Sequence, residues 1–201
     1  MTTDPPDGRF RHIPNALTLL RIALVPVIVA LMMADTPSML LLAAILFCAA
    51  SLTDWLDGYA ARRLGVESNL GRMLDPIADK LLVVAVLVVL IAIDRIAGWA
   101  VVPALVIMLR EFLVGGVREF LAGIGAAGLP SSPLAKVKTA VQMAALLTLM
   151  VAGEVLADLP LAMIGLVGLW LAAVLAAVSA GDYLAKALGQ VRTITGSRTA
   201  P

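Results

Sequence analysis

Four aspartates in the first half of the chain have a spacing that suits metal chemistry. Asp54 and Asp57 are three residues apart, and Asp75 and Asp79 are four apart, so in helices each pair shares one face. Both pairs border apolar segments, where carboxylates are costly unless they are paired, hydrated or bound to a metal. Oxygen-only ligands favour Mg²⁺ or Mn²⁺. We therefore expect these four side chains to bind two divalent cations, which would clamp a diphosphate.

The alternative is that the aspartates are helix caps or partners of nearby basic residues. Asp75 precedes Pro76, as an N-cap residue before a proline at the first helical position would. Four acids in two facing pairs nevertheless favour the metal site over this structural role. Three nearby residues would help to bind a nucleotide or diphosphate, one by close backbone approach and two by charge: Gly58, Arg62 and Arg72.

The elements that must position these residues are transmembrane helices. The chain has 201 residues, of which 61% are hydrophobic, and a mean hydropathy of +1.00. Soluble domains are usually 45–50% apolar, so we expect an all-α, polytopic membrane protein that forms a single domain over residues 1–201. Short flexible ends are expected at 1–8 and 192–201. Six spans are predicted, near 15–34, 38–60, 75–93, 98–124, 134–156 and 160–186.

Loop charges predict the orientation of these spans. The net charge is only +1 and the chain contains no block of basic residues, so nucleic acid is disfavoured as a partner. Arginines and lysines gather at both ends and in the second and fourth loops, whereas the opposite loops contain only Arg95. By the positive-inside rule, both termini are therefore expected in the cytoplasm.

The aspartates belong to a longer pattern, D-x-x-D-G-x-x-A-R-x8-G-x3-D-x3-D, which is complete from Asp54 to Asp79. This pattern resembles the signature of the CDP-alcohol phosphotransferases. The resemblance implies a homodimer of six-helix subunits with two metal ions on the four aspartates. It also implies that Asp79 is the general base on the acceptor hydroxyl, and that CMP is the leaving group. By the family's pattern, residues at the CDP-lipid would also include Asn15, Thr18, Ser68 and Gly71.

Other segments narrow the acceptor alcohol. The segments Ile13–Arg21, Arg110–Phe112 and Ala135–Thr139 are similar to those of bacterial inner-membrane members that join CDP-diacylglycerol to sn-glycerol 3-phosphate. The charges agree with a dianionic acceptor, because its phosphate suits a cationic pocket. The residues expected to form this pocket are Arg110, Arg118, Lys136 and Lys138.

Each part of this pocket has a plainer alternative. Arg110 and Glu111 are ionisable residues inside an apolar span, and a structural ion pair between them is the simplest explanation. Adjacent helix residues do not face each other, however, so we expect each to have a different partner. Lys136 and Lys138 would otherwise be topology signals and lipid headgroup contacts.

Other functions remain open. Inositol phosphate or phosphatidylglycerol could replace glycerol phosphate as the acceptor with the same chemistry. A cation transporter also needs intramembrane carboxylates, but here the acids gather on one side of the membrane. Prenyl-diphosphate enzymes use aspartate pairs and Mg²⁺, but without this glycine, alanine and arginine spacing.

Overall fold

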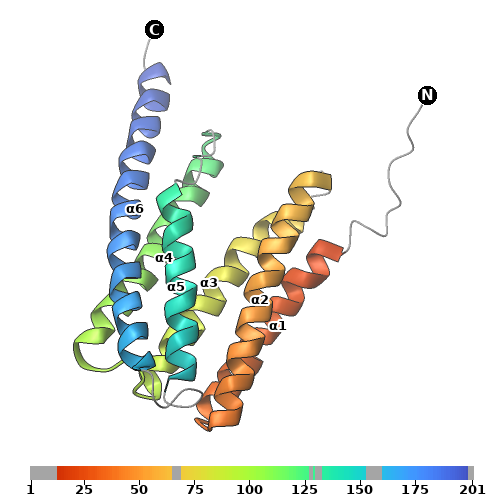
Figure 1. Cartoon of the computed structure of the whole chain (residues 1–201). Helices are drawn as coiled ribbons and strands as arrows, with labels where there is room; N and C mark the ends of the chain where they lie inside the picture. Colours follow the sequence, from red (N-terminus) through yellow and green to blue (C-terminus); the bar gives the residue numbers. More distant parts are fainter. Residues whose placement is uncertain (1–12, 65–68, 127–128, 130–132, 153–159, 199–201) are drawn as a thin grey trace. The chain divides into compact units, whose positions relative to one another are not determined.

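The computed structural model describes residues 13–64, 69–126, 129, 133–152 and 160–198, and this part of the chain is helical with no strand (Figure 1). The chain divides into two compact units, Met1–Ile93 and Asp94–Pro201. The expectation of an all-α protein is confirmed.

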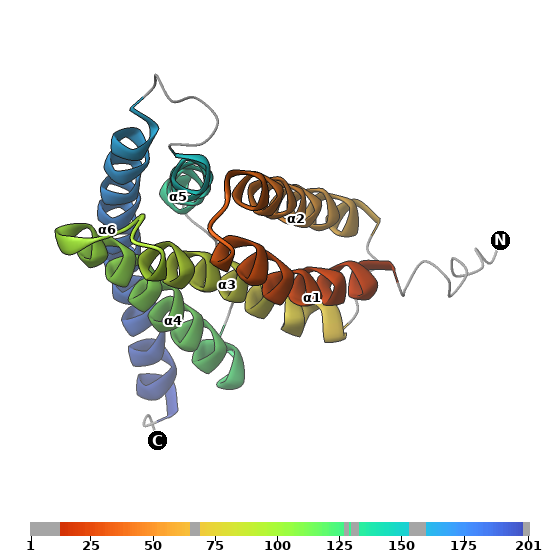
Figure 2. The ribbon, with the colours of Figure 1, turned by 90° about the horizontal axis from the view of Figure 1, so that it is seen from below.

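The first unit consists of three helices that meet around its N-terminal helix. They are α1 (Ile13–Met33), α2 (Pro37–Leu64) and α3 (Asn69–Ala92). Helix α1 packs against both α2 and α3, as Figure 2 shows. Fully buried apolar side chains from all three helices form the core, among them Ile28, Phe47 and Leu87. Helix α1 is thus the element that places its own polar residues against α3.

The turn between α1 and α2 depends on an aspartate in the left-handed region. Asp35 has a φ of 44°, and its amide donates to the Met32 carbonyl at 3.1 Å. Aspartate tolerates this conformation better than most residues. Pro37 then starts α2, where its missing amide hydrogen costs nothing. This break lies where the sequence predicted it.

Helix α3 begins before the expected position. It starts at Asn69 rather than near residue 75, so Pro76 lies inside the helix instead of in its first turn. The alternative in which Asp75 caps this helix is therefore excluded. Proline is usually a poor interior helix residue, and this preference led to the late predicted start.

The second unit is also organised around one long helix. A 3₁₀ turn, η2 (Gly98–Ala100), leads into α4 (Val101–Gly123), and α5 (Pro133–Val151) and α6 (Leu161–Arg198) follow. Helix α6 packs against both α4 and α5. It continues to Arg198, although we expected a flexible end from residue 192.

Small residues let α5 and α6 approach closely. A Cβ atom added at Gly165 would lie 2.7 Å from Cγ of Leu149. A Cβ atom added at Gly168 would lie 3.1 Å from Cβ of Ala145. Gly165 and Gly168 therefore pack against α5 within the bundle, as small residues do between membrane helices.

Arg95, the one basic residue of the loops predicted to lie outside the cytoplasm, has a structural partner. Its Nη1 donates a hydrogen bond to the carbonyl of Ala152, just past the end of α5. The last carbonyls of a helix have no partner within the helix, and basic side chains often satisfy them.

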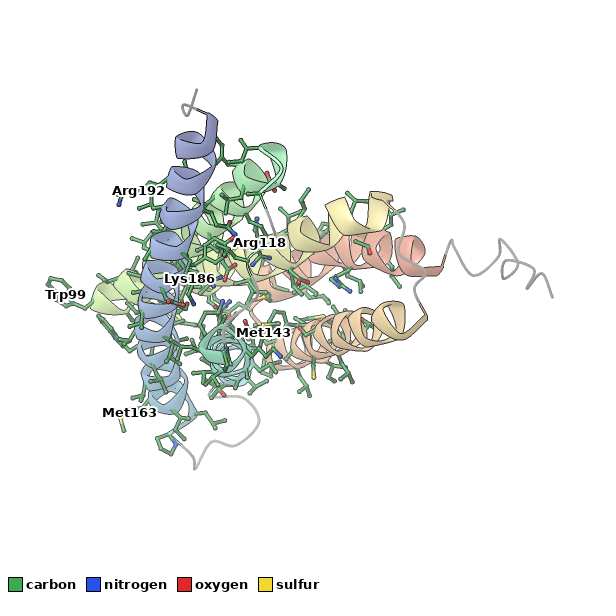
Figure 3. The ribbon with its side chains drawn as sticks, turned by 90° about the horizontal axis from the view of Figure 1, so that it is seen from above. Trp99, Arg118, Met143, Met163, Lys186 and Arg192 are labelled. Atoms are coloured by element: carbon green, nitrogen blue, oxygen red, sulfur yellow. The ribbon has the colours of Figure 1, made fainter. Side chains whose placement is uncertain are left out.

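Three helical segments within the described residues are long and apolar enough to cross a membrane: Gly98–Gly123, Pro133–Val151 and Leu161–Arg192. Two shorter apolar stretches, Thr18–Met33 and Pro37–Thr53, lie in the first unit. Large apolar side chains face outward, as at Trp99 and Met163, which are 85% and 64% exposed (Figure 3). These features are those of a membrane protein, whereas the full set of six spans remains a prediction.

Candidate active site

The backbone places the four aspartates on two helices, as the sequence predicted. Asp54 and Asp57 lie on α2, and Asp75 and Asp79 lie on α3. Only Asp79 has a described side chain, and among the described residues no three acidic, histidine or cysteine side chains form a group. The metal site therefore stays a prediction. The predicted residues that lie outside the described side chains are Asn15, Asp54, Asp57, Gly58, Arg62, Ser68, Gly71, Arg72 and Asp75.

Asp79 forms an ion pair with Arg21 of α1. Nη1 of Arg21 lies 3.3 Å from Oδ1 of Asp79. The arginine side chain is only 3% exposed, whereas the aspartate side chain is 51% exposed. A buried guanidinium needs a negative partner, because an isolated charge in an apolar region is very costly. Arg21 thus anchors the carboxylate, which still keeps an open surface for a ligand.

Arg21 was not among the predicted site residues. The signal that could have identified it is its position, because an arginine within an apolar run is by default a functional candidate. Thr18, which was predicted to contact the CDP-lipid, is 3% exposed and lies one helical turn before Arg21. Both residues therefore lie on the buried side of α1, which packs against α2 and α3.

A second polar group joins α4 to α5. Oε1 of Glu111 lies 3.1 Å from Nη1 of Arg110 and 2.6 Å from Nζ of Lys138. The three side chains are 15%, 14% and 3% exposed, respectively. We call Arg110, Glu111 and Lys138 the α4–α5 charge cluster. It brings together two of the four predicted acceptor-binding cations.

The expectation that Arg110 and Glu111 have different partners is wrong. Their Cβ atoms diverge on the helix, but the long arginine side chain curls back to its neighbour. One carboxylate oxygen then serves two cations, since Lys138 approaches the same Oε1. The pattern of one helix could not reveal this arrangement, because Lys138 comes from another helix.

The other two predicted cations lie outside this cluster. The guanidinium carbon of Arg118 is 5.9 Å from the centre of the Tyr183 ring on α6, within range of a cation–π interaction. Lys136 is exposed. Near Tyr183, Lys186 pairs with Asp182 at 2.7 Å, one turn apart on α6. Figure 3 labels Arg118 and Lys186. Among the described residues, no ion pair links Arg118 or Lys136 to the charge cluster.

The polar sites fall within a region with known relatives. A family model described as CDP-alcohol phosphatidyltransferase matches residues 11–180, which include every predicted site residue. A protein of Rickettsia bellii is 42% identical over 172 residues, covering 86% of this chain and 93% of its own length. It is named CDP-diacylglycerol–glycerol-3-phosphate 3-phosphatidyltransferase.

Two proteins from other bacteria carry the same name. The Bacillus subtilis protein is 39% identical over 191 residues, covering 87% of this chain and 94% of its own length. The Salmonella choleraesuis protein is 34% identical over 181 residues, covering 90% of this chain and 97% of its own length. The similarity therefore extends over nearly the whole of each protein, rather than over one motif.

Proposed function

Since this chain belongs to the CDP-alcohol phosphatidyltransferase family, we propose that it transfers the phosphatidyl group of CDP-diacylglycerol to sn-glycerol 3-phosphate. The products are phosphatidylglycerophosphate and CMP. The observation that carries the proposal is the shared name of relatives from separate bacterial genera, which are 34–42% identical over most of the chain. The complete aspartate pattern from Asp54 to Asp79 supports it independently.

The proposed reaction needs no protein nucleophile. The acceptor's 1-hydroxyl oxygen forms a bond to the phosphorus of the phosphatidyl group, and the bond from that phosphorus to the oxygen of CMP breaks. CMP leaves with the electron pair, and Asp79 takes the hydroxyl proton. Asp79 suits this role because half of its side chain is exposed, while Arg21 restrains one carboxylate oxygen.

Two Mg²⁺ or Mn²⁺ ions would be held by Asp54, Asp57, Asp75 and Asp79. The described member of this set fits a metal ligand, because the side chain of Asp79 is half exposed and carboxylate oxygens are the ligands that Mg²⁺ and Mn²⁺ prefer. When bound, the ions would supply charge stabilisation for the diphosphate.

The remaining predicted residues are assigned to the two substrates. We propose that Thr18, on the buried side of α1, contacts the CDP-lipid. The same role is proposed for Asn15, Gly58, Arg62, Ser68, Gly71 and Arg72. For the acceptor phosphate, the α4–α5 charge cluster supplies Arg110 and Lys138, and we propose the same role for Arg118 and Lys136.

The proposal is tested by CMP release from CDP-diacylglycerol with a panel of acceptors. We expect release with sn-glycerol 3-phosphate and none above background with free glycerol, which lacks the phosphate for the cationic residues. Preference for inositol phosphate would keep the phosphate-binding role but change the acceptor. Preference for serine or phosphatidylglycerol would overturn the acceptor proposal. Uptake of cations without CMP release would favour a transporter.

We further propose six spans in a bacterial inner membrane, with both termini in the cytoplasm. The support is the distribution of basic residues between the loops. A reporter protein fused after Pro201 should be active only in the cytoplasm, and activity in the periplasm would contradict the orientation.

We also propose that the enzyme is a homodimer, on the family resemblance. Its mass in mild detergent, measured by light scattering with the detergent subtracted, should equal that of two chains. The mass of a single chain would refute this.

A further inference from the structure

We propose that Glu111 selects the acceptor by accepting a hydrogen bond from a free hydroxyl group of a polyol phosphate, while Arg110 and Lys138 bind its phosphate. This inference rests on the proposed function and adds a specificity-determining residue to it. The charge cluster would then bind both the phosphate and a non-reacting hydroxyl group of a small hydroxylated phosphate ester.

The two oxygens of Glu111 have unequal surroundings. Oε1 accepts from both Arg110 and Lys138, at 3.1 and 2.6 Å. Oε2 receives no hydrogen bond from any residue that the structure describes. A carboxylate can accept about four hydrogen bonds, so this side chain retains acceptor capacity. A hydroxyl group supplies the kind of donor that Oε2 lacks.

The charges in the cluster do not balance. Two cations and one carboxylate leave one net positive charge among side chains that are 3–15% exposed. A structural ion pair would need only one cation, and an excess buried charge is costly. Nε of Arg110 is also buried and has no partner among the described residues. An anion such as a phosphate would satisfy both the excess charge and this donor.

A second buried acceptor lies close in sequence to the cluster. Gln142 is one helical turn after Lys138 on α5, is 1% exposed, and its Oε1 has no hydrogen-bond partner among the described residues. Buried polar atoms are rarely left without a partner in native structures. The same side of α5 therefore carries a buried cation and a buried acceptor with unused capacity, a combination that suits a ligand with both an anion and hydroxyl groups.

The test compares two acceptors that differ by one hydroxyl. The compound 3-hydroxypropyl phosphate keeps the phosphate and the attacking primary hydroxyl of sn-glycerol 3-phosphate but lacks the secondary hydroxyl. The wild-type enzyme should favour glycerol phosphate by roughly tenfold to a hundredfold in kcat/KM, as a hydrogen bond to a charged group would give. In Glu111→Gln this ratio should fall on the order of tenfold, because the charge assistance is lost.

The ratio of the two kcat/KM values distinguishes acceptor selection by Glu111 from a merely structural role of this residue. If Glu111 only held Lys138 in place, its substitution would affect both acceptors equally and leave the ratio unchanged, which would overturn the proposal. An equal preference of the wild-type enzyme for both acceptors would also overturn it. Glu119→Gln is the matched control, since it removes an exposed carboxylate from the same helix. This variant should keep the wild-type ratio.

Two further results keep the test decisive. Should Glu111→Gln fail to fold, Glu111→Asp keeps the negative charge of the cluster but withdraws the carboxylate by one methylene, and its ratio must also fall. If the wild-type protein releases no CMP with glycerol phosphate, the proposed function itself fails. A wild-type enzyme that is active but has an unchanged ratio in both variants refutes only the role of Glu111.

Discussion

Removal of divalent cations by a chelator is expected to abolish CMP release, and addition of Mg²⁺ or Mn²⁺ should restore it. Asp→Asn at any one of Asp54, Asp57, Asp75 or Asp79 should lower kcat at least about a hundredfold, which is typical for the loss of a metal ligand or a general base. Asparagine keeps the size of the side chain but removes the charge that holds the cation. The measurement is CMP release at saturating metal and both substrates.

Asp94→Asn is the control for this series. Asp94 is exposed in the segment before α4 and has a φ of 57°, a conformation that asparagine tolerates as well as aspartate. Its activity should equal that of the wild type. Near-normal turnover with Mg²⁺ in both Asp57→Asn and Asp75→Asn would show that these carboxylates do not hold the metal, and would leave them as partners of nearby basic residues.

The second large loss of activity is expected when cationic residues assigned to the acceptor phosphate are replaced. Replacement of Lys138 by Met and Arg118 by Gln in one variant should reduce kcat/KM for glycerol phosphate on the order of a hundredfold to ten-thousandfold. Each lost charged hydrogen bond is worth roughly 1.5–3 kcal/mol, and about 1.4 kcal/mol corresponds to a factor of ten. The KM for CDP-diacylglycerol should change much less, because these cations are assigned to the other substrate.

Lys186→Met is the matched control, because Lys186 is an exposed lysine whose partner Asp182 lies one turn away on the same helix. Surface pairs of this kind contribute little to stability, so we expect near wild-type kinetics. Equal losses for both substrates in the double variant would assign Lys138 and Arg118 to folding or topology rather than to the acceptor. Folding is checked by the elution profile of the purified variant in detergent.

The general architecture was accessible from the sequence because its causes are local. Long apolar runs separated by Asp35, Pro37 and Gly98 predicted helices close to those observed. The predicted start of α3 was wrong because local preference excludes proline from helix interiors, whereas the helix in fact extends from Asn69 through Pro76. Local rules therefore located the elements better than their ends.

The candidate site was predictable where its residues form a pattern along one segment. The aspartate motif identified the family without any structure, and the family match confirms that identification. The pairing of Arg21 with Asp79 could not be predicted in this way, because the two residues are far apart in the chain and meet only through the packing of α1 on α3. The same holds for Lys138 and Glu111, which come from α5 and α4.

The sequence by itself determined the helical class, the membrane setting and the family, since hydropathy and motif spacing are properties of consecutive residues. Only the tertiary structure decided which charges neutralise each other. Buried cations must find an anion wherever the packed helices supply one. Arg21 therefore restrains the carboxylate of Asp79, and Arg110 and Lys138 share one oxygen of Glu111. That choice of partners arises from helix packing, because it brings together side chains that no local pattern relates.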